Sequence, residues 1–421
     1  MKKVPKRRFK GFLNAGDWEQ RKLGELLEQP ITDGPHETPE LYDSGIPFIS
    51  VDAIIDNKID FTKMRGCISK EYDDICAKKY KPQINDVYLV KSGATIGKVA
   101  IVDTYDDFNI WSPLAAMRCG SITNPYFLYV LLQTKDLQTQ VFNKASHGTQ
   151  PNLSMRQLET FACKVPKIEE QILISRFFKR LNDSITLHQR KLEKLQATKK
   201  ALLYELFPIE NSRRPKLRFK GFTGDWEQRK LISCIQKVID FRGRTPNKLG
   251  MEWSCSGHLA LSALNVKDGY IDFSQDNHYG DNDLYEKWMT GNELHKGQVV
   301  FTTEAPMGNV AQIPDNERYI LSQRTVAFCV DENIITENFL AVLLRTPVVF
   351  KTLTKLSSGG TAQGISQKSL AEIEVRIPPN LHEQQIISNF LLSFEHCITL
   401  HQRKLEKLKN LKAAYLNEMF V

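Results

Sequence analysis

The eleven residues ITLHQRKLEKL occur twice without a change, at 185–195 and at 398–408. Apolar side chains around each copy recur at alternating steps of four and three residues, the spacing of a heptad seam along one face of a helix. Such a seam packs against a partner helix, and the chain supplies two. The sequence therefore predicts two long helices paired as an antiparallel coiled coil. The alternative is two ordinary amphipathic helices, each buried against its own domain.

The residues expected at the pairing surface share this spacing. They are Leu181, Ile185, His188, Leu192, Leu195 and Leu202 in the first helix, and Ile398, His401, Leu405, Leu408 and Tyr415 in the second. Lys199 and Lys412 fall on the same seam. Polar seam residues weaken helix pairing but can set its register.

The helix repeat belongs to a larger duplication. RFKGF at 8–12 returns at 218–222, and GDWEQRKL at 16–23 returns at 224–231. The pair Glu170-Gln171, just before the first helix, returns as Glu383-Gln384. The chain is therefore two copies of one unit, a globular module followed by a long helix. The predicted boundaries are 1–165 and 218–378 for the modules, 166–207 and 379–421 for the helices, and 208–217 for a linker.

The modules are predicted to be α/β (α+β) rather than doubly wound, because long alternation of strands and helices is absent. Runs rich in β-branched and aromatic residues predict strands at 46–51, 87–90, 99–102, 299–301 and 326–330. Helical patterns cover 126–132, 339–344 and 153–161. Asn152 and Ser154 are both candidate N-caps for the helix within 153–161.

Composition is that of an ordinary globular protein, with 41% hydrophobic and 25% charged residues among 421 and a net charge of +8. No apolar run approaches the roughly 18 residues of a membrane span. The basic start MKKVPKRRFK is not followed by the apolar stretch of a secretion signal, so we expect a cytoplasmic location and no membrane partner. The eight cysteines lack the spacing of a zinc site, so we expect reduced thiols and no metal.

Together these features resemble the specificity subunit of type I restriction–modification enzymes. The resemblance covers essentially the whole chain and is carried by 218-RFKGFTGDWEQRKL-231, 93-GATIGKVAIVD-103, 148-GTQPNLSMRQLETF-161 and the two HQRKLEKL helices. It implies two target recognition domains, each binding one half of an asymmetric, bipartite site on double-stranded DNA. It further implies that the paired helices set the half-site spacing and bind methyltransferase (modification) subunits, two per chain. Restriction (helicase–nuclease) subunits would complete the complex, and these partners would perform adenine methylation and cleavage.

A catalytic function finds little support in the residues. The segment 93-GATIGK-98 is one residue short of a phosphate-binding loop and lacks the hydroxyl residue after its lysine. The segment 124-NPYF-127 lacks the second proline of the motif with which adenine methyltransferases hold a flipped base, and it suits a helix start with Asn124 as cap. We therefore expect a non-catalytic chain without a cofactor.

DNA contact is then the leading hypothesis. Gly-rich loops allow main-chain amides to approach phosphates, and side-chain amides can read adenine edges. The candidate loops are 32–38, 91–98 and 146–152 in the first module and 241–246, 302–309 and 357–364 in the second. The candidate DNA-binding residues are Lys91, Ser92, Thr95, Lys98, Ser146, His147, Thr149, Gln150, Asn152, Arg242, Arg244, Thr303, Asn309, Ser358, Thr361 and Gln363. The alternative for any single residue is a solvated turn.

Predicted helix length also favours a gapped target. About 38 residues make a helix of about 55 Å, which exceeds one DNA turn of about 34 Å. Two other functions compete with this one. A stand-alone DNA methyltransferase or nuclease predicts cofactor binding or metal-dependent activity, and a coiled-coil adaptor predicts no sequence-dependent DNA binding.

Overall fold

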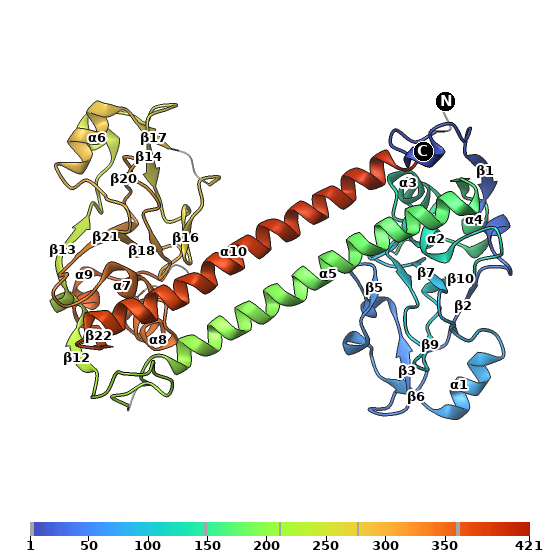
Figure 1. The fold of residues 1–421 in the computed structure, drawn as a ribbon, viewed down its shortest axis with the longest axis horizontal. Coiled ribbons are helices and arrows are strands. Elements are labelled where there is room, and N and C mark those ends of the chain that lie inside the picture. Colours follow the sequence, from blue (N-terminus) through green and yellow to red (C-terminus); the bar gives the residue numbers. More distant parts are fainter. Residues whose placement is uncertain (1–3, 147–149, 210–211, 276–277, 359–362) are drawn as a thin grey trace. The chain divides into compact units, whose positions relative to one another are not determined.

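The computed structural model describes residues 4–146, 150–209, 212–275, 278–358 and 363–421. These residues form two compact units (Figure 1). Unit 1 comprises Met1–Gln189 together with Arg403–Val421, and unit 2 comprises Arg190–Gln402. Each unit thus contains one module, part of its own long helix and part of the other.

The two modules share one order of elements. In unit 1 the strands are β1 Glu19–Lys22, β2 Thr32–Asp33, β3 Ile46–Ile49, β4 Ile54–Ile55, β5 Lys58–Ile59, β6 Cys67–Ile68, β7 Val87–Val90, β8 Val99–Ile101, β9 Asn109–Ile110, β10 Leu114–Met117 and β11 Ala162–Val165. Its helices are α1 Lys70–Ala77, α2 Pro125–Leu131, α3 Lys135–Lys144, α4 Met155–Glu159 and the start of α5 Ile168–Glu205.

Unit 2 repeats the pattern. Its strands are β12 Glu227–Lys230, β13 Ile235–Asp240, β14 His258–Leu261, β15 Val266–Lys267, β16 Tyr270–Ile271, β17 Tyr279–Gly280, β18 Val299–Thr302, β19 Val310–Gln312, β20 Ile320–Leu321, β21 Thr325–Val330 and β22 Glu374–Ile377. Its helices are α6 Asn282–Met289, α7 Glu337–Leu343, α8 Pro347–Leu356, α9 Gln367–Ala371 and the start of α10 Leu381–Glu418.

A mixed sheet system fills each module. The antiparallel sheet β2-β10-β7-β8 of unit 1 corresponds to β13-β21-β18-β19 of unit 2. A smaller sheet in each contains one parallel pair, β3 with β9 and β14 with β20. The predicted α+β class is confirmed. The predicted strands at 87–90 and 326–330 lie at the centre of these sheets.

Strand β7 shows why the larger sheet is stable. Successive side chains of a strand point to opposite faces. Val87 and Leu89 enter the core formed with α2 and α5, while Tyr88 and Val90 enter a second core against β9 and β10. All four residues are fully buried. Strand β18 repeats this division, with Val299 and Phe301 on one face and Val300 on the other.

The repeated segment DWEQRKL opens each module in the same way. Trp18 packs edge-on against Phe127 and against Phe420, near the end of α10, at centroid distances of 6.0 and 5.9 Å. Trp226 packs the same way against Phe339 and against Phe207, just after α5, at 5.9 and 5.7 Å. Each module therefore packs against the end of the helix that belongs to the other module. In unit 1 this is the end of α10, and in unit 2 it is the end of α5.

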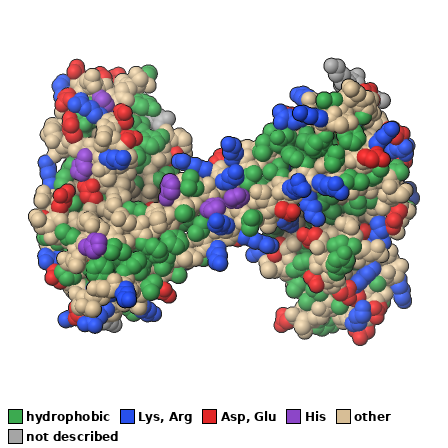
Figure 2. All heavy atoms as spheres, viewed as in Figure 1, with side chains coloured by type: hydrophobic (Ala, Val, Ile, Leu, Met, Phe, Trp, Pro, Cys, Tyr) green, Lys and Arg blue, Asp and Glu red, His purple; other side chains and the backbone are tan. Residues whose placement is uncertain are grey.

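The helices pair within each unit. Phe177 of α5 and Tyr415 of α10 pack at 4.8 Å in unit 1, and Lys199 of α5 and Glu395 of α10 form an ion pair of 3.0 Å in unit 2. In unit 1 the first half of α5 therefore contacts the last part of α10. In unit 2 the last part of α5 contacts the first half of α10. Both contacts are those of an antiparallel helix pair. Each predicted seam residue is buried or half-buried, whereas Lys191, Lys194 and Lys404 are exposed. Figure 2 shows Lys and Arg side chains along this outer helix surface.

The repeated Glu-Gln pair has a structural explanation. Glu170 forms a buried two-bond ion pair with Arg8 of the RFKGF segment, at 2.7 Å for both bonds. Gln171 accepts a hydrogen bond from Asn124 N at 2.9 Å, at the start of α2. Glu383 and Gln384 repeat these contacts with Arg218 and Thr336 N. Each pair therefore attaches its long helix to the start and to the centre of its module.

Candidate nucleic-acid interface

The three candidate loops of unit 1 come together. Gly93 N donates to Pro151 O at 3.0 Å, and Leu153 N donates to Lys91 O at 2.8 Å, so loop 91–98 lies against residues 151–153, where the loop that begins at Ser146 ends. Loop 32–38 joins them through the ion pair between Asp33 and Lys91 at 3.4 Å. Segments that are distant in the sequence therefore form one surface.

Unit 2 assembles its loops in the same way. Ile365 N donates to Thr303 O at 2.9 Å, and Glu304 forms a bridge with Gly364, so loop 302–309 lies against residues 364–365, where the loop that begins at Ser357 ends. Arg242 of loop 241–246 donates to Ile365 O at 3.1 Å. The convergence of loops is thus a shared property of both units.

A buried aspartate organises the cations of the unit 1 surface. Asp33, at the end of β2, is fully buried and makes ion pairs with Lys79 and with Lys91 at 3.4 Å, and its carboxylate lies 3.1 Å from His36 Nε2. The Lys91 side chain is only 10% exposed, whereas Lys79 is 50% exposed. Lys79 is therefore the more accessible ammonium group of this cluster.

In unit 2 the corresponding aspartate pairs with a different cation. Asp240 ends β13 as Asp33 ends β2, and its carboxylate binds Arg242 at 2.5 Å and accepts from Gln367 at 2.8 Å. Thr303 stands where unit 1 has Lys91, and its hydroxyl donates to Arg324 O at 3.3 Å. The two surfaces share a scaffold and differ in the groups that they present.

Three further candidates make contacts inside their modules. Lys98 donates to Ile54 O at 3.2 Å, and the equivalent Asn309 donates to Val266 O at 2.9 Å, so both tie their loop to a neighbouring hairpin. Arg244 donates to Trp288 O, and its guanidinium lies 4.6 Å from the centre of the Phe241 ring.

The remaining candidates differ in exposure. Ser146, Gln150, Asn152, Arg242, Ser358 and Gln363 are exposed, and Ser92 and Thr95 are half-buried. His147, Thr149 and Thr361 lie outside the described residues. Sequence reasoning included loop 32–38 without singling out Asp33 or His36, and it missed Lys79 as a member of the surface. The one available signal for Lys79 was its position in the stretch 63–84, which has little similarity to the second module.

The two segments tested for catalysis have structural roles. Segment 93–98 turns between β7 and β8, and its lysine is the one bound to Ile54 O. Asn124 caps α2, accepting from Tyr126 N and Phe127 N at 3.1 Å each, with Pro125 in the first turn. Among the described residues, no group of three or more His, Cys, Asp or Glu side chains is placed to hold a metal ion. None of the described helices is long and apolar enough to span a membrane.

Comparison with known proteins places this architecture. The family described as "Type I restriction modification DNA specificity domain" matches residues 15–197 and 265–410. Two curated proteins of Methanocaldococcus jannaschii, named as the MjaX and MjaVIII specificity subunits of type I restriction enzymes, are 24% and 23% identical; each match spans 95% of this chain and 92% or 91% of the relative. The crystal structure of a type I restriction–modification S subunit from M. genitalium has the same fold, with a TM-score of 0.67, 12% identity and 99% of each chain covered.

The fold and the paired modules thus define the class of type I DNA specificity proteins. The chain belongs to the family of type I restriction–modification specificity subunits.

Proposed function

We propose that each unit binds one half of an asymmetric, bipartite target on double-stranded DNA through its converged loops. The observation that carries this proposal is the meeting of three polar loops in each unit beside an aspartate. Fully buried Asp33 pairs with Lys79 and Lys91 in unit 1, and half-buried Asp240 pairs with Arg242 in unit 2. Equivalent scaffolds that present different cations and amides suit the reading of two different sequences.

Within this proposal the polar residues have two roles. Lys79 and Arg242 neutralise phosphates, because each is accessible and oriented by a carboxylate. Gln150, Asn152 and Gln363 are exposed amides on the same loops and read base edges. Lys98, Asn309 and Arg244 support the loops from within, since each donates to a main-chain carbonyl of its own module.

The proposal assigns the chemistry to other subunits. Methyltransferase subunits, two per chain, would modify adenine, and restriction subunits would cleave. Helices α5 and α10 are each continuous over 38 residues, and the proposal gives them the task of setting the half-site spacing. Their exposed lysines offer a basic surface to a partner or to DNA.

The test measures DNA binding by the chain assembled with its modification subunits. Lys79→Ala should weaken binding to every sequence and lower the slope of log K against log salt by about one, because one phosphate contact is lost. Gln150→Ala should change the preferred bases in one half of the methylated motif and leave the other half intact. Lys6→Ala, at an exposed residue outside these loops, is the control.

The results that would refute the proposal are equally concrete. An unaltered salt slope for both Lys79→Ala and Arg242→Ala would place the loops away from DNA. A methylation motif changed in both halves by a substitution in one unit would contradict independent reading.

A further inference from the structure

The two units differ at the outer edge of an equivalent strand pair. β1 pairs with β11 in unit 1 as β12 pairs with β22 in unit 2. In unit 1, Gln140 of α3 reaches this edge: its side-chain amide accepts from Ala162 N at 2.9 Å and donates to Ala162 O at 3.0 Å. The Gln140 amide thus occupies the position that a residue of an adjoining strand would take.

The corresponding edge in unit 2 is open. Glu374 pairs with Lys230 as Ala162 pairs with Lys22, so Glu374 corresponds to Ala162. Leu231 N donates to Ile373 O at 2.8 Å, so the next residue, Glu374, directs its main-chain N–H and C=O away from β12.

Thr352 stands at the position of Gln140, and its hydroxyl donates to Val348 O of its own helix at 3.1 Å. Among the described residues, none therefore replaces the Gln140 amide at Glu374. Within the described part of the chain, the main-chain N–H and C=O of Glu374 therefore have no hydrogen-bond partner.

A second pair of differences opens a groove beside this edge. In unit 1, Lys144 donates to Thr160 Oγ1 at 2.9 Å and lies 5.2 Å from the centre of the Phe161 ring, covering the surface with its aliphatic stem. Unit 2 has Leu356 and Glu372 at the positions of Lys144 and Thr160.

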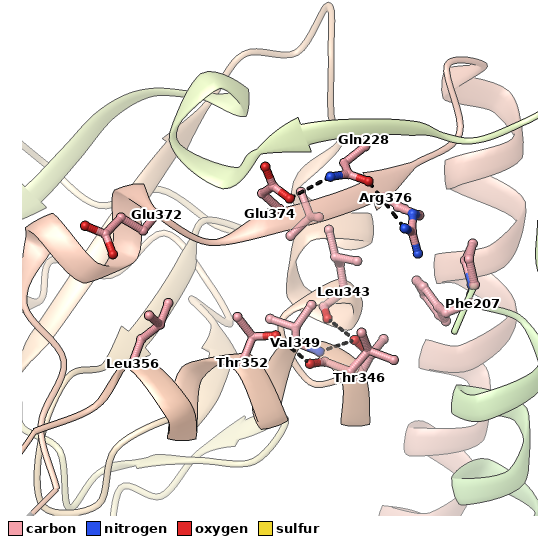
Figure 3. A pocket seen from close by; sticks show the side chains of 13 residues that line it. Phe207, Gln228, Leu343, Thr346, Val349, Thr352, Leu356, Glu372, Glu374 and Arg376 are labelled. Atoms are coloured by element: carbon pink, nitrogen blue, oxygen red, sulfur yellow. Dashed lines mark hydrogen bonds between the residues drawn. The ribbon is translucent and has the colours of Figure 1, made fainter. Parts of the chain in front are cut away.

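The result is a groove of about 370 Å³ between α8 and the β12–β22 pair. In Figure 3, Val349, Thr352 and Leu356 form one wall of this groove, and Glu372 and Glu374 lie across from them. The Glu372 side chain is exposed.

We propose that this groove binds an extended segment of a partner protein, which adds as a strand to the edge of β22 and places a lysine beside Glu372. Unit 1 indicates the chemistry of this partner segment. There the equivalent space is filled by the Gln140 amide, which pairs with the main chain of Ala162, and by the Lys144 side chain. In unit 2 a carboxylate replaces the Thr160 hydroxyl, which favours a cation further, and Val349 and Leu356 accept apolar side chains on alternate residues. Strand addition of this kind takes affinity from main-chain hydrogen bonds and selectivity from side-chain pockets. The proposal does not rest on DNA binding.

The experiment uses the full chain and a labelled peptide in which valine and threonine alternate around a central lysine. Fluorescence anisotropy measures binding, and hydrogen exchange measures protection of the Glu374 amide. The peptide should bind and slow exchange at Glu374, and the same peptide with a central glutamate should bind at least about tenfold more weakly. Glu372→Lys should reverse this preference.

Thr352→Gln introduces the side chain that pairs with the strand edge in unit 1. Because it would occupy the main-chain groups of Glu374, it should weaken peptide binding at least about tenfold. Thr354→Gln makes the same substitution at an exposed position of α8 and should leave binding unchanged. Exchange at the Ala162 amide, in the other unit, checks that each variant is folded.

Two results would overturn the proposal. Equal peptide binding by the wild-type chain and Thr352→Gln, including no binding by either, would show that the edge is not a docking site. Protection of Glu374 that grows with protein concentration without peptide, and disappears in Thr352→Gln, would assign the groove to a second copy of the chain.

Discussion

Lys199 and Lys412 occupy equivalent seam positions, but charged partners surround the first and neutral amides lie beside the second. In unit 2, Lys199 pairs with Glu395 at 3.0 Å, and Glu395 also binds Arg345 at 2.5 Å. Arg345 in turn pairs with Asp268. The lysine therefore belongs to a chain of alternating charges.

Unit 1 replaces the two central members of that chain with amides. Gln133 stands at the position of Arg345 and Asn182 at that of Glu395. Lys412 donates to Gln133 Oε1 at 3.0 Å, while Asn182 donates to the hydroxyl of Tyr126 at 2.8 Å. Burial, with a smaller contribution from the nearby charge of Lys58, lowers the pKa of Lys412 to about 8.

In this duplicated chain, the position of the seam lysine and the compensation of its charge are determined by different parts of the sequence. The helix sequence reproduces the position of a lysine, but the module that receives it decides whether its charge is compensated. Geometry has been retained between the copies while electrostatics has diverged.

Removing the central carboxylate of unit 2 should have the largest effect. Glu395→Gln leaves Lys199 without its carboxylate and Arg345, whose side chain is 6% exposed, with Asp268 alone. We expect a loss of about 3 kcal/mol in the free energy of opening of unit 2, because a buried cation loses its partner. Hydrogen exchange of the β21 amides measures it. Asn182→Ala, the matched change in unit 1, should cost only about 1 kcal/mol for one lost hydrogen bond; equal losses would contradict the comparison.

Lys412→Met should change the pH dependence of unit 1. Below pH 8 the lysine is protonated in the folded and the unfolded chain, so the cost of burying its charge is present in full. Between pH 8 and the ordinary value of 10.5, the unfolded chain holds a proton that the folded chain lacks, so stability rises with pH. We expect a rise of about 2 kcal/mol, allowing for partial exposure.

The Lys412→Met variant should lack this rise and be the more stable protein at pH 7. Hydrogen exchange of α2 amides at several pH values, corrected for intrinsic exchange, gives the comparison. Other groups that titrate in this range are common to both proteins and cancel. Parallel profiles for the two proteins would show that Lys412 keeps its ordinary pKa.

Asn182→Glu should have the smallest effect of the three. It gives Lys412 the carboxylate that Lys199 has in Glu395, so we expect the pKa of Lys412 to rise and unit 1 to gain about 1 kcal/mol at pH 7. The same exchange measurements should place the rise in stability at higher pH than in the wild-type chain. Asn182→Gln, which adds length without charge, is the control. An unchanged dependence of stability on pH in Asn182→Glu would mean that position 182 does not correspond to Glu395 in its effect on the seam lysine.

Much of the fold was predictable from the sequence because duplication supplied an internal comparison. The repeated DWEQRKL and Glu-Gln segments marked the parts that attach each helix to its module. The heptad spacing of Leu192 and Leu405 marked the buried face, since each is 7% exposed in the structure. Local signals also placed strands β7 and β21. Ser154, one of two candidate caps, receives the hydrogen bond from Gln157 N.

The candidate interface was less predictable because its residues are assigned by contacts between distant segments. The sequence named loops that the structure brings into contact, but it did not show that Lys98 and Asn309 would each bind the carbonyl of a hairpin about 45 residues earlier, at Ile54 and Val266. Nor did it show that Asp33 would hold Lys79 and Lys91 together. Such pairings follow from tertiary packing and leave no periodic pattern.

The contact between residues 7–18 and residues 418–420 in unit 1 has a consequence for biosynthesis. Arg7 N donates to Glu418 O at 2.8 Å, and Phe420 packs on Trp18 and Phe127. Synthesis from the N-terminus delivers the first module long before Phe420, so its aromatic core stays uncovered until α10 has been made. The second module receives Phe207 from the segment that directly precedes it. The first module is therefore completed only after the second module has been made, and we expect its uncovered aromatic surface to be prone to misassembly in the meantime.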